Sequence, residues 1–138
     1  VGTGERMEYV RTIAQEAGVS GRVTFAGHRD DIPEVLKSSD ITVLSSHYEG
    51  LSLSSVECMA AGRPFIASDV PGLHDIVSGA GILVPDNDAQ ALAYTITKLC
   101  NNPSFYRNTA ENCRKRALDY DISTMTNGYL KLYSEIKA

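Results

Sequence analysis

The sequence predicts a three-layer α/β/α domain built on a doubly wound parallel sheet, with additional helices at the C-terminus. Two observations predict it. Short apolar runs rich in β-branched residues recur between residues 23 and 84, and amphipathic helical patterns lie between them. Strand–helix–strand alternation with short connections is typical of this class. Continuous apolar runs suit strands that are covered on both faces, as in a parallel sheet.

Four segments are predicted as strands: 23–26 (VTFA), 41–44 (ITVL), 64–67 (PFIA) and 81–84 (GILV). In open parallel sheets, ligands bind beyond the carboxyl ends of the strands. The loops expected at those ends are 2–4, 27–30, 45–52, 68–72 and 85–88. Most of these loops contain Gly or Pro, so the pattern predicts the location of a binding site without giving its chemistry.

Helices are predicted in seven segments, at Glu5–Ala17, Asp30–Leu36, Leu53–Ala61, Pro71–Val77, Asp88–Leu99, Ser104–Leu118 and Ser123–Lys137. Gly18 suits the residue that follows a helix C-terminus, and Asp88 suits an N-cap. Residues 103–138 contain no strand pattern. Tyr120, Tyr129 and Tyr133 in this region are predicted to be helix-packing residues.

Length and composition favour one globular domain that is not a nucleic-acid-binding protein. The 138 residues carry a net charge of -4, which argues against a surface for DNA or RNA. No apolar run approaches the roughly 20 residues that span a bilayer, and no signal peptide is apparent. Cys58, Cys100 and Cys113 lack metal-ligand spacing, so reduced thiols, no metal and a cytoplasmic location are expected.

The helix predicted from Leu53 carries a carboxylate in an unexpected place. Leu53, Val56 and Ala60 define an apolar stripe, and Glu57 occupies the stripe position that should also be apolar. An inward carboxylate is costly unless it is hydrogen-bonded. A sugar diol would satisfy it, because one carboxylate can accept from two neighbouring hydroxyls. Pairing of Glu57 with an Arg or Lys is the alternative.

A second acid, Glu49, lies just before this helix and is followed by Gly50. Glycine lets the backbone come close to a ligand. The free amides of residues 51–54 at the helix start would form an anion site suited to a diphosphate. Glu49 would then face the group beyond the phosphates. An exposed loop Glu beside a turn Gly is the alternative.

The two acids and their flanks resemble the E-x7-E motif of retaining GT-B glycosyltransferases of the family 4, or group 1, type. Residues 48–51 (YEGL) resemble the "EGF" turn, and residues 57–64 (ECMAAGRP) resemble "EAMACGKP". Further similar segments follow the same order along nearly the whole chain: 1–4 (VGTG), 23–27 (VTFAG), 68–72 (SDVPG) and 83–85 (LVP). Six motifs in register are far more specific than E-x7-E alone.

The resemblance implies that residues 1–138 form a single Rossmann-like domain, the C-terminal half of a GT-B fold. Glu57 would accept the ribose hydroxyls of the donor, and Glu49 would act as the catalytic residue that contacts the transferred sugar. Backbone amides for the sugar and diphosphate would come from Gly50, Leu51, Ser52 and Leu53. The base would be bordered by Gly27, His28 and Arg29, and the domain cleft by Gly2 and Gly4.

The implied reaction moves a sugar from a nucleotide diphosphate to a glycan, lipid or other acceptor, with retention at the anomeric carbon. It needs no metal or cofactor, because amides and basic side chains carry the leaving-group charge. The family's upstream Arg and Lys, its first strand region and its N-terminal acceptor domain are absent from residues 1–138. The chain alone is therefore expected to be inactive. Asp75 stands where the family commonly has Glu.

Two other classes stay open at this point: half of a nucleotide-sugar epimerase, and a non-enzymatic α/β regulatory module. His28, His47 and His74 are spread over three loops, and the sequence gives His47 no partner for a role as base. The sequence specifies neither the donor base and sugar nor the acceptor, the linkage or the oligomeric state. Peripheral membrane association of a longer parent protein also stays open.

Overall fold

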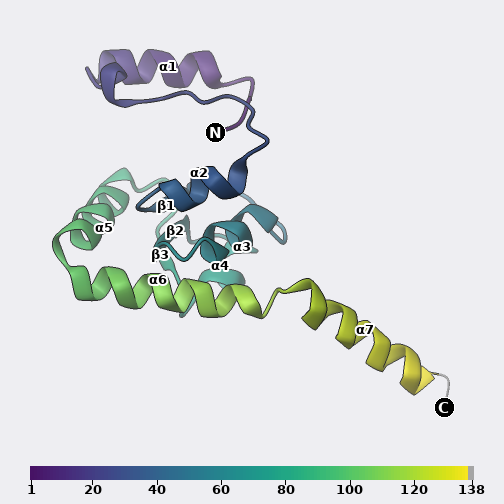
Figure 1. Ribbon diagram of the computed structural model, residues 1–138. Helices are drawn as coiled ribbons and strands as arrows, with labels where there is room; N and C mark the ends of the chain where they lie inside the picture. Colours follow the sequence, from purple (N-terminus) through teal and green to yellow (C-terminus); the bar gives the residue numbers. More distant parts are fainter. Residues whose placement is uncertain (137–138) are drawn as a thin grey trace. The chain divides into compact units, whose positions relative to one another are not determined.

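The computed structural model describes residues 1–136, which fall into two compact units. Unit 1 is Val1–Ile32, and unit 2 begins at Pro33. All the strands and most of the helices belong to unit 2 (Figure 1). The predicted mixture of helices and parallel strands is confirmed, and the differences below concern particular elements.

Unit 1 contains helix α1 (Met7–Glu16), the short 3-10 helix η1 (Ser20–Arg22) and an extended segment after it. As predicted, α1 ends at a glycine, and Gly18 has a φ of +68°. The predicted apolar face of α1 is only partly covered, because Ala14 is buried whereas Val10 and Ile13 are exposed.

The prediction of a strand at residues 23–26 is wrong, because this segment is extended but has no ladder. A strand needs a neighbouring strand that exchanges hydrogen bonds with it along its length. Within the described part of unit 1, the chain start offers only the bond from the Gly2 amide to the Gly27 carbonyl, at 2.6 Å. Phe25 instead packs under the guanidinium of Arg11, 4.4 Å from the ring centroid.

Unit 2 is built on a parallel sheet of β1 (Thr42–Leu44), β2 (Phe65–Ser68) and β3 (Ile82–Val84), in that order. The register pairs Val43 with Ile66, and Ile66 with Ile82. These strands confirm three of the four predicted segments. Every residue of β2 is buried, as expected for a central strand covered on both faces.

Two groups of helices cover the two faces of this sheet (Figure 1). Helix α2 (Ile32–Ser38) begins at the last residue of unit 1 and otherwise belongs to unit 2. The other helices of unit 2 are α3 (Leu53–Ala60), α4 (Leu73–Val77), α5 (Ala89–Asn101), α6 (Pro103–Leu118) and α7 (Ile122–Ile136). One core cluster joins Met59, Leu73 and Cys113 to Phe65, and the other joins Leu99 to Ile66. Since Phe65 and Ile66 point to opposite faces of β2, α3, α4 and most of α6 cover one face, and α5 with the first turn of α6 covers the other. The predicted three layers are present.

Several helix ends are fixed by side chains. The Asp88 carboxylate accepts from the Ala91 amide at 2.8 Å, which confirms the predicted N-cap. At the C-terminal end of α4, Arg116 of α6 donates to the carbonyls of Ile76, at 2.9 Å, and Ser78, at 3.1 Å. A cation on the last carbonyls of a helix opposes the negative end of its dipole. Helix α4 is therefore held firmly against α6.

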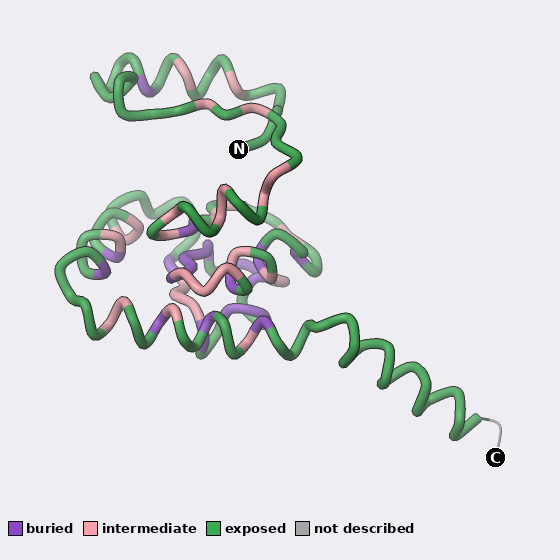
Figure 2. Tube along the Cα trace, viewed as in Figure 1, coloured by how far each residue is buried: buried purple, intermediate pink, exposed green. Residues whose placement is uncertain are grey.

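Helix α7 is exposed along its whole described length (Figure 2). Tyr129 and Tyr133, which were predicted to pack against other helices, are exposed and stack on one another with ring centroids 6.4 Å apart. None of the helices in residues 1–136 has the length and apolar character needed to cross a membrane.

Helix α3 buries a different face from the one predicted. The buried positions are Ser52, Ser55 and Met59, whereas Leu53 is 71% exposed. Small residues let the helix approach the core, and the Ser55 hydroxyl is satisfied by donating to the Ser52 carbonyl at 2.7 Å. The prediction that Glu57 points inward is therefore wrong, because Glu57 lies on the exposed side of α3.

Candidate functional site

The parallel order of the strands brings three predicted loops of unit 2 to one edge of the sheet. The loop of residues 45–52 follows β1, residues 69–72 follow β2, and residues 85–88 follow β3. The carboxyl ends of parallel strands are the usual position of ligands in α/β folds. The candidate site in unit 2 is assembled from these loops and the start of α3.

The first loop holds Glu49 in a defined position. Its Oε1 accepts a hydrogen bond from the Ser46 hydroxyl at 2.8 Å, and the side chain is partly buried. This bond occupies part of the carboxylate's capacity, because a carboxylate offers about four acceptor positions. Glu49 therefore keeps acceptor capacity for another hydroxyl.

The backbone amides at the start of α3 form a second feature. The amides of residues 51–54 have no hydrogen-bond partner within residues 1–136, and the side chain of Ser52 at the N-cap makes no capping bond. Unsatisfied amides together with the helix dipole attract anions. The helix start therefore has the unsatisfied donors that an anion site requires, and phosphate binding there stays a prediction.

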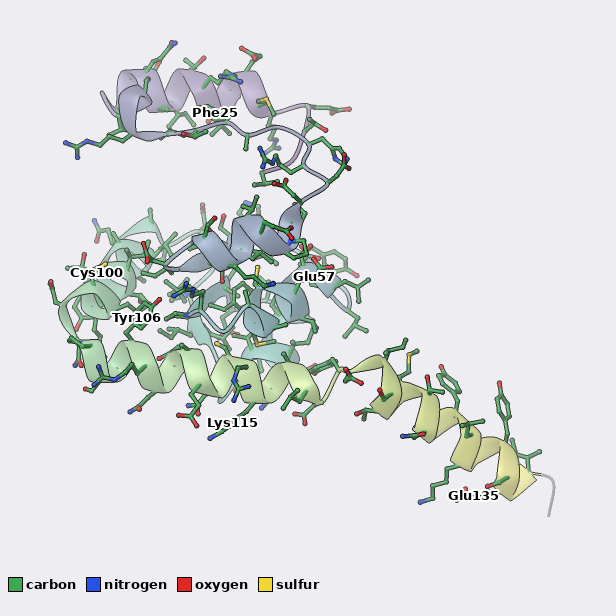
Figure 3. All side chains as sticks on the ribbon, viewed as in Figure 1. Phe25, Glu57, Cys100, Tyr106, Lys115 and Glu135 are labelled. Atoms are coloured by element: carbon green, nitrogen blue, oxygen red, sulfur yellow. The ribbon has the colours of Figure 1, made fainter. Side chains whose placement is uncertain are left out.

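The Glu57 carboxylate is the third feature (Figure 3). It is exposed, and within the described part of the chain it makes neither a hydrogen bond nor an ion pair. The alternative considered above, a pairing of Glu57 with an Arg or Lys, is not what this structure shows. A free carboxylate that follows the helix start by one turn is available to a ligand bound at those amides.

A cavity of about 300 Å³ lies at the same edge of the sheet. Ser68 and Val84 come from the strand ends, and Leu92 comes from α5. His47 and Asp86 also line the cavity, and the His47 Nδ1 lies 2.8 Å and 3.1 Å from the two Asp86 carboxylate oxygens, which accept its proton. This pair ties the loop after β1 to the loop after β3. The structure thus gives His47 the partner that sequence analysis did not find.

A further pair, His74 and Asp69, connects α4 to the loop after β2. The His74 Nδ1 lies 2.6 Å from an Asp69 oxygen. The hydrogen bond to Asp69, followed by the charge of Asp69, raises the pKa of His74 above 6.5. The two residues lie only five positions apart, but no pattern in the sequence predicts that they pair.

We expect this pair to make the loop after β2 sensitive to pH. The folded pKa of His74 is raised, so its contribution to stability is fully present below pH 6.5 and is lost as the pH rises through the folded pKa. An NMR titration of the imidazole checks this. Asp69→Asn should return the pKa towards 6.5, and Asp75→Asn, which removes a weaker influence, should change it less. An unchanged midpoint in Asp69→Asn would contradict the assignment.

The predicted site residues of unit 1 are only partly brought together. Gly2, Gly4 and Gly27 line an open groove of about 520 Å³ within unit 1. His28 and Arg29 do not line it. The His28 Nε2 lies 3.1 Å from Asp30 Oδ1, and the Arg29 guanidinium donates two hydrogen bonds to the Asp31 carboxylate. The hydrogen bond to Asp31, followed by the charge of Asp31, raises the pKa of Arg29, so Arg29 stays charged and is paired with Asp31. Of the five predicted residues in unit 1, only the three glycines therefore meet at this groove.

The cysteines take no part in the candidate site. All three are free thiols, as predicted. Burial raises the pKa of Cys58 and of Cys113, which keeps both in the unreactive thiol form. Cys100 is exposed on α5.

Comparison with known proteins gives a consistent result. The chain matches the family described as "Glycosyl transferases group 1" over residues 1–116. It is 35% identical, over 119 residues, to N,N'-diacetylbacillosaminyl-diphospho-undecaprenol alpha-1,3-N-acetylgalactosaminyltransferase of Campylobacter jejuni. That match covers 85% of this chain and 32% of the relative.

Solved structures agree in fold. Sucrose-phosphate synthase from Thermosynechococcus elongatus is similar, with a TM-score of 0.84 and 33% identity over 96% of this chain and 35% of that one. Anabaena HepE, solved in complex with UDP, has a TM-score of 0.88 at 24% identity, over 97% of this chain and 39% of HepE. The chain spans about a third of the length of these proteins. Since the family match extends over most of the sequence, the chain belongs to the group 1 glycosyl transferases.

Proposed function

We propose that this chain is the donor-binding domain of a longer retaining glycosyltransferase. In this proposal residues 1–138 form one domain, and upstream sequence supplies its first strand region and an N-terminal acceptor-binding domain. The relatives are about three times as long as the chain, which supports this organisation. The substrate is a nucleotide diphosphate sugar, and the product is a glycan, lipid or other acceptor that carries the transferred sugar.

One observation carries the proposal: Glu57 and the amides at the start of α3 are all without partners in the described chain. A diphosphate on the amides and a ribose diol on Glu57 would satisfy both at once. Glu49, restrained by Ser46, would contact the transferred sugar and stabilise charge that develops at its anomeric carbon.

Gly50 supports a ligand at this place. Its φ is not in the left-handed region, and a Cβ built on it would meet no atom within 4 Å. The fold of the chain therefore does not require glycine here. A ligand that passes close to the backbone would require it.

We expect Gly50→Ala to weaken donor binding without weakening the fold. The free energy of unfolding should be unchanged or rise by about 0.4–1 kcal/mol, because alanine restricts the unfolded chain. The Kd for the donor should rise about tenfold or more, which corresponds to roughly 1.4 kcal/mol of lost contact. Calorimetry with the donor checks this. The control variant is Gly21→Ala, since a Cβ built on Gly21 also meets no atom within 4 Å. Equal donor affinity in Gly50→Ala and Gly21→Ala would count against the proposed position of the ligand.

The family match favours this function over an epimerase half or a regulatory module. Retention of the anomeric configuration, a cytoplasmic location and a role in polysaccharide biosynthesis belong to the proposal as well. Peripheral membrane association of the longer protein is compatible with an acceptor that is carried by a lipid. HepE was solved with UDP, so UDP-sugars are the first donors to test.

The function is tested by titrating the longer protein with UDP-, GDP- and ADP-sugars in a calorimeter. We expect one class to bind, and turnover with a radiolabelled donor of that class. Residues 1–138 alone should bind it weakly and show negligible transfer, because part of the cleft is missing. Failure of all three classes to bind the longer protein would refute the function. Turnover by residues 1–138 at the rate of the longer protein would refute the proposal that transfer also needs the upstream sequence.

A further inference from the structure

We propose that Gly72 is a positioning residue for the sugar-contacting acid: it fixes the backbone turn at Glu49 and Gly50. Gly72 lies in the loop after β2, just before α4. This inference rests on the proposed function, since it concerns the orientation in which Glu49 meets the transferred sugar.

The contact is between two backbones. A Cβ built on Gly72 would overlap with the carbonyl oxygens of Glu49 and Gly50, and it would lie 3.0 Å from the Glu49 carbonyl carbon. No flexible side chain could move aside to make room. Gly72 also has a φ of +87°, which other residues adopt at a cost. Both the conformation and the available space restrict this position to glycine.

Gly72 sits on the rigid side of this contact. All of β2 before it is buried, Val70 is 6% exposed, and Leu73 after it is 0% exposed. Helix α4 is also anchored at its C-terminus by Arg116. The loop after β2 is therefore a platform whose displacement would disturb the core.

The loop after β1 is more easily displaced than the loop after β2. Tyr48 is 82% exposed and Leu51 is 68% exposed, so neither anchors the loop by packing. The described bonds that restrain it are those from Ser46 to Glu49 and between His47 and Asp86. A side chain at position 72 would push the Glu49–Gly50 backbone outward by roughly 1 Å, a displacement that can reduce the rate of a reaction about 100-fold.

The experiment compares Gly72→Ala with Gly79→Ala in the longer protein. Gly79 has a similar φ of +77°, but a Cβ there would meet nothing closer than Arg116 Nη2, at 3.9 Å. Both variants therefore carry a similar backbone strain, and only Gly72→Ala carries the overlap with the turn. Thermal unfolding, kcat and KM with the donor, and the Kd of the nucleoside diphosphate alone are measured for each.

We expect both variants to fold and to lose similar thermal stability. Gly79→Ala should keep its kcat, whereas Gly72→Ala should lose about 100-fold in kcat while its Kd for the nucleoside diphosphate changes by less than about threefold. Equal kcat values in the two variants would overturn the inference. A Gly72→Ala protein that cannot fold would overturn it too, because the loop and not the platform is expected to give way. If the unmodified protein binds no nucleotide sugar, the proposed function itself fails, which is a distinct outcome.

Discussion

Glu57→Ala is expected to reduce the kcat/KM of the longer protein for its donor by roughly 100-fold or more. The substitution would remove two hydrogen bonds between the Glu57 carboxylate and the ribose hydroxyls, each worth about 1.5–3 kcal/mol because one partner is charged. The reason for expecting so large an effect is that Glu57 has no other partner in the described chain. Its acceptor capacity is unused until a ligand arrives.

The same substitution should leave the fold intact. Glu57 is exposed on α3, and exposed substitutions usually change the free energy of unfolding by less than about 0.5 kcal/mol. Steady-state kinetics and thermal unfolding are measured side by side. Glu111→Ala on α6 is the matched control, since Glu111 is a helical, solvent-exposed acid paired with Lys115. A Glu57→Ala enzyme whose kcat/KM equals that of the control would exclude the proposed contact with ribose.

Glu49→Gln should reduce kcat by about 100- to 1,000-fold while the nucleoside diphosphate still binds. Glutamine has nearly the same size and can keep the bond with Ser46, but it carries no negative charge. Loss of one electrostatic stabiliser of a transition state typically has an effect of this size. Because the nucleotide and its phosphates contact other groups in the proposal, their binding does not depend on Glu49.

Single-turnover kinetics and calorimetry with the nucleoside diphosphate separate these two effects. Ser46→Ala is the companion variant, since it removes the restraint on Glu49 and keeps the charge. It should have a smaller effect on kcat than Glu49→Gln. A Glu49→Gln enzyme with normal kcat would show that the acid only shapes the loop.

The architecture was predictable because it depends on local patterns. Continuous apolar runs marked β1, β2 and β3, and the carboxylate of Asp88 marked the start of α5. The segment at residues 23–26 has the same pattern, but a strand exists only when a neighbour completes its ladder. A single sequence does not show whether that neighbour is present.

The candidate site was predictable in its location and less so in its geometry. The helical period was correct for α3, but the face was wrong, since buried serines such as Ser55 are not counted as apolar. The His47–Asp86 pair joins residues 39 positions apart, which no local pattern reveals. Gly72 is required by a contact with a distant turn, and this too is a property of the folded chain.

The most direct measurement compares two donors that differ only in the ribose, one complete and one without its 2′ and 3′ hydroxyls. Calorimetry gives the affinity of each for the unmodified longer protein and for Glu57→Ala. We predict that the unmodified protein prefers the complete donor by roughly 100-fold and that Glu57→Ala binds the two within about threefold of each other. A preference of the same size in both proteins would show that Glu57 does not hold the ribose.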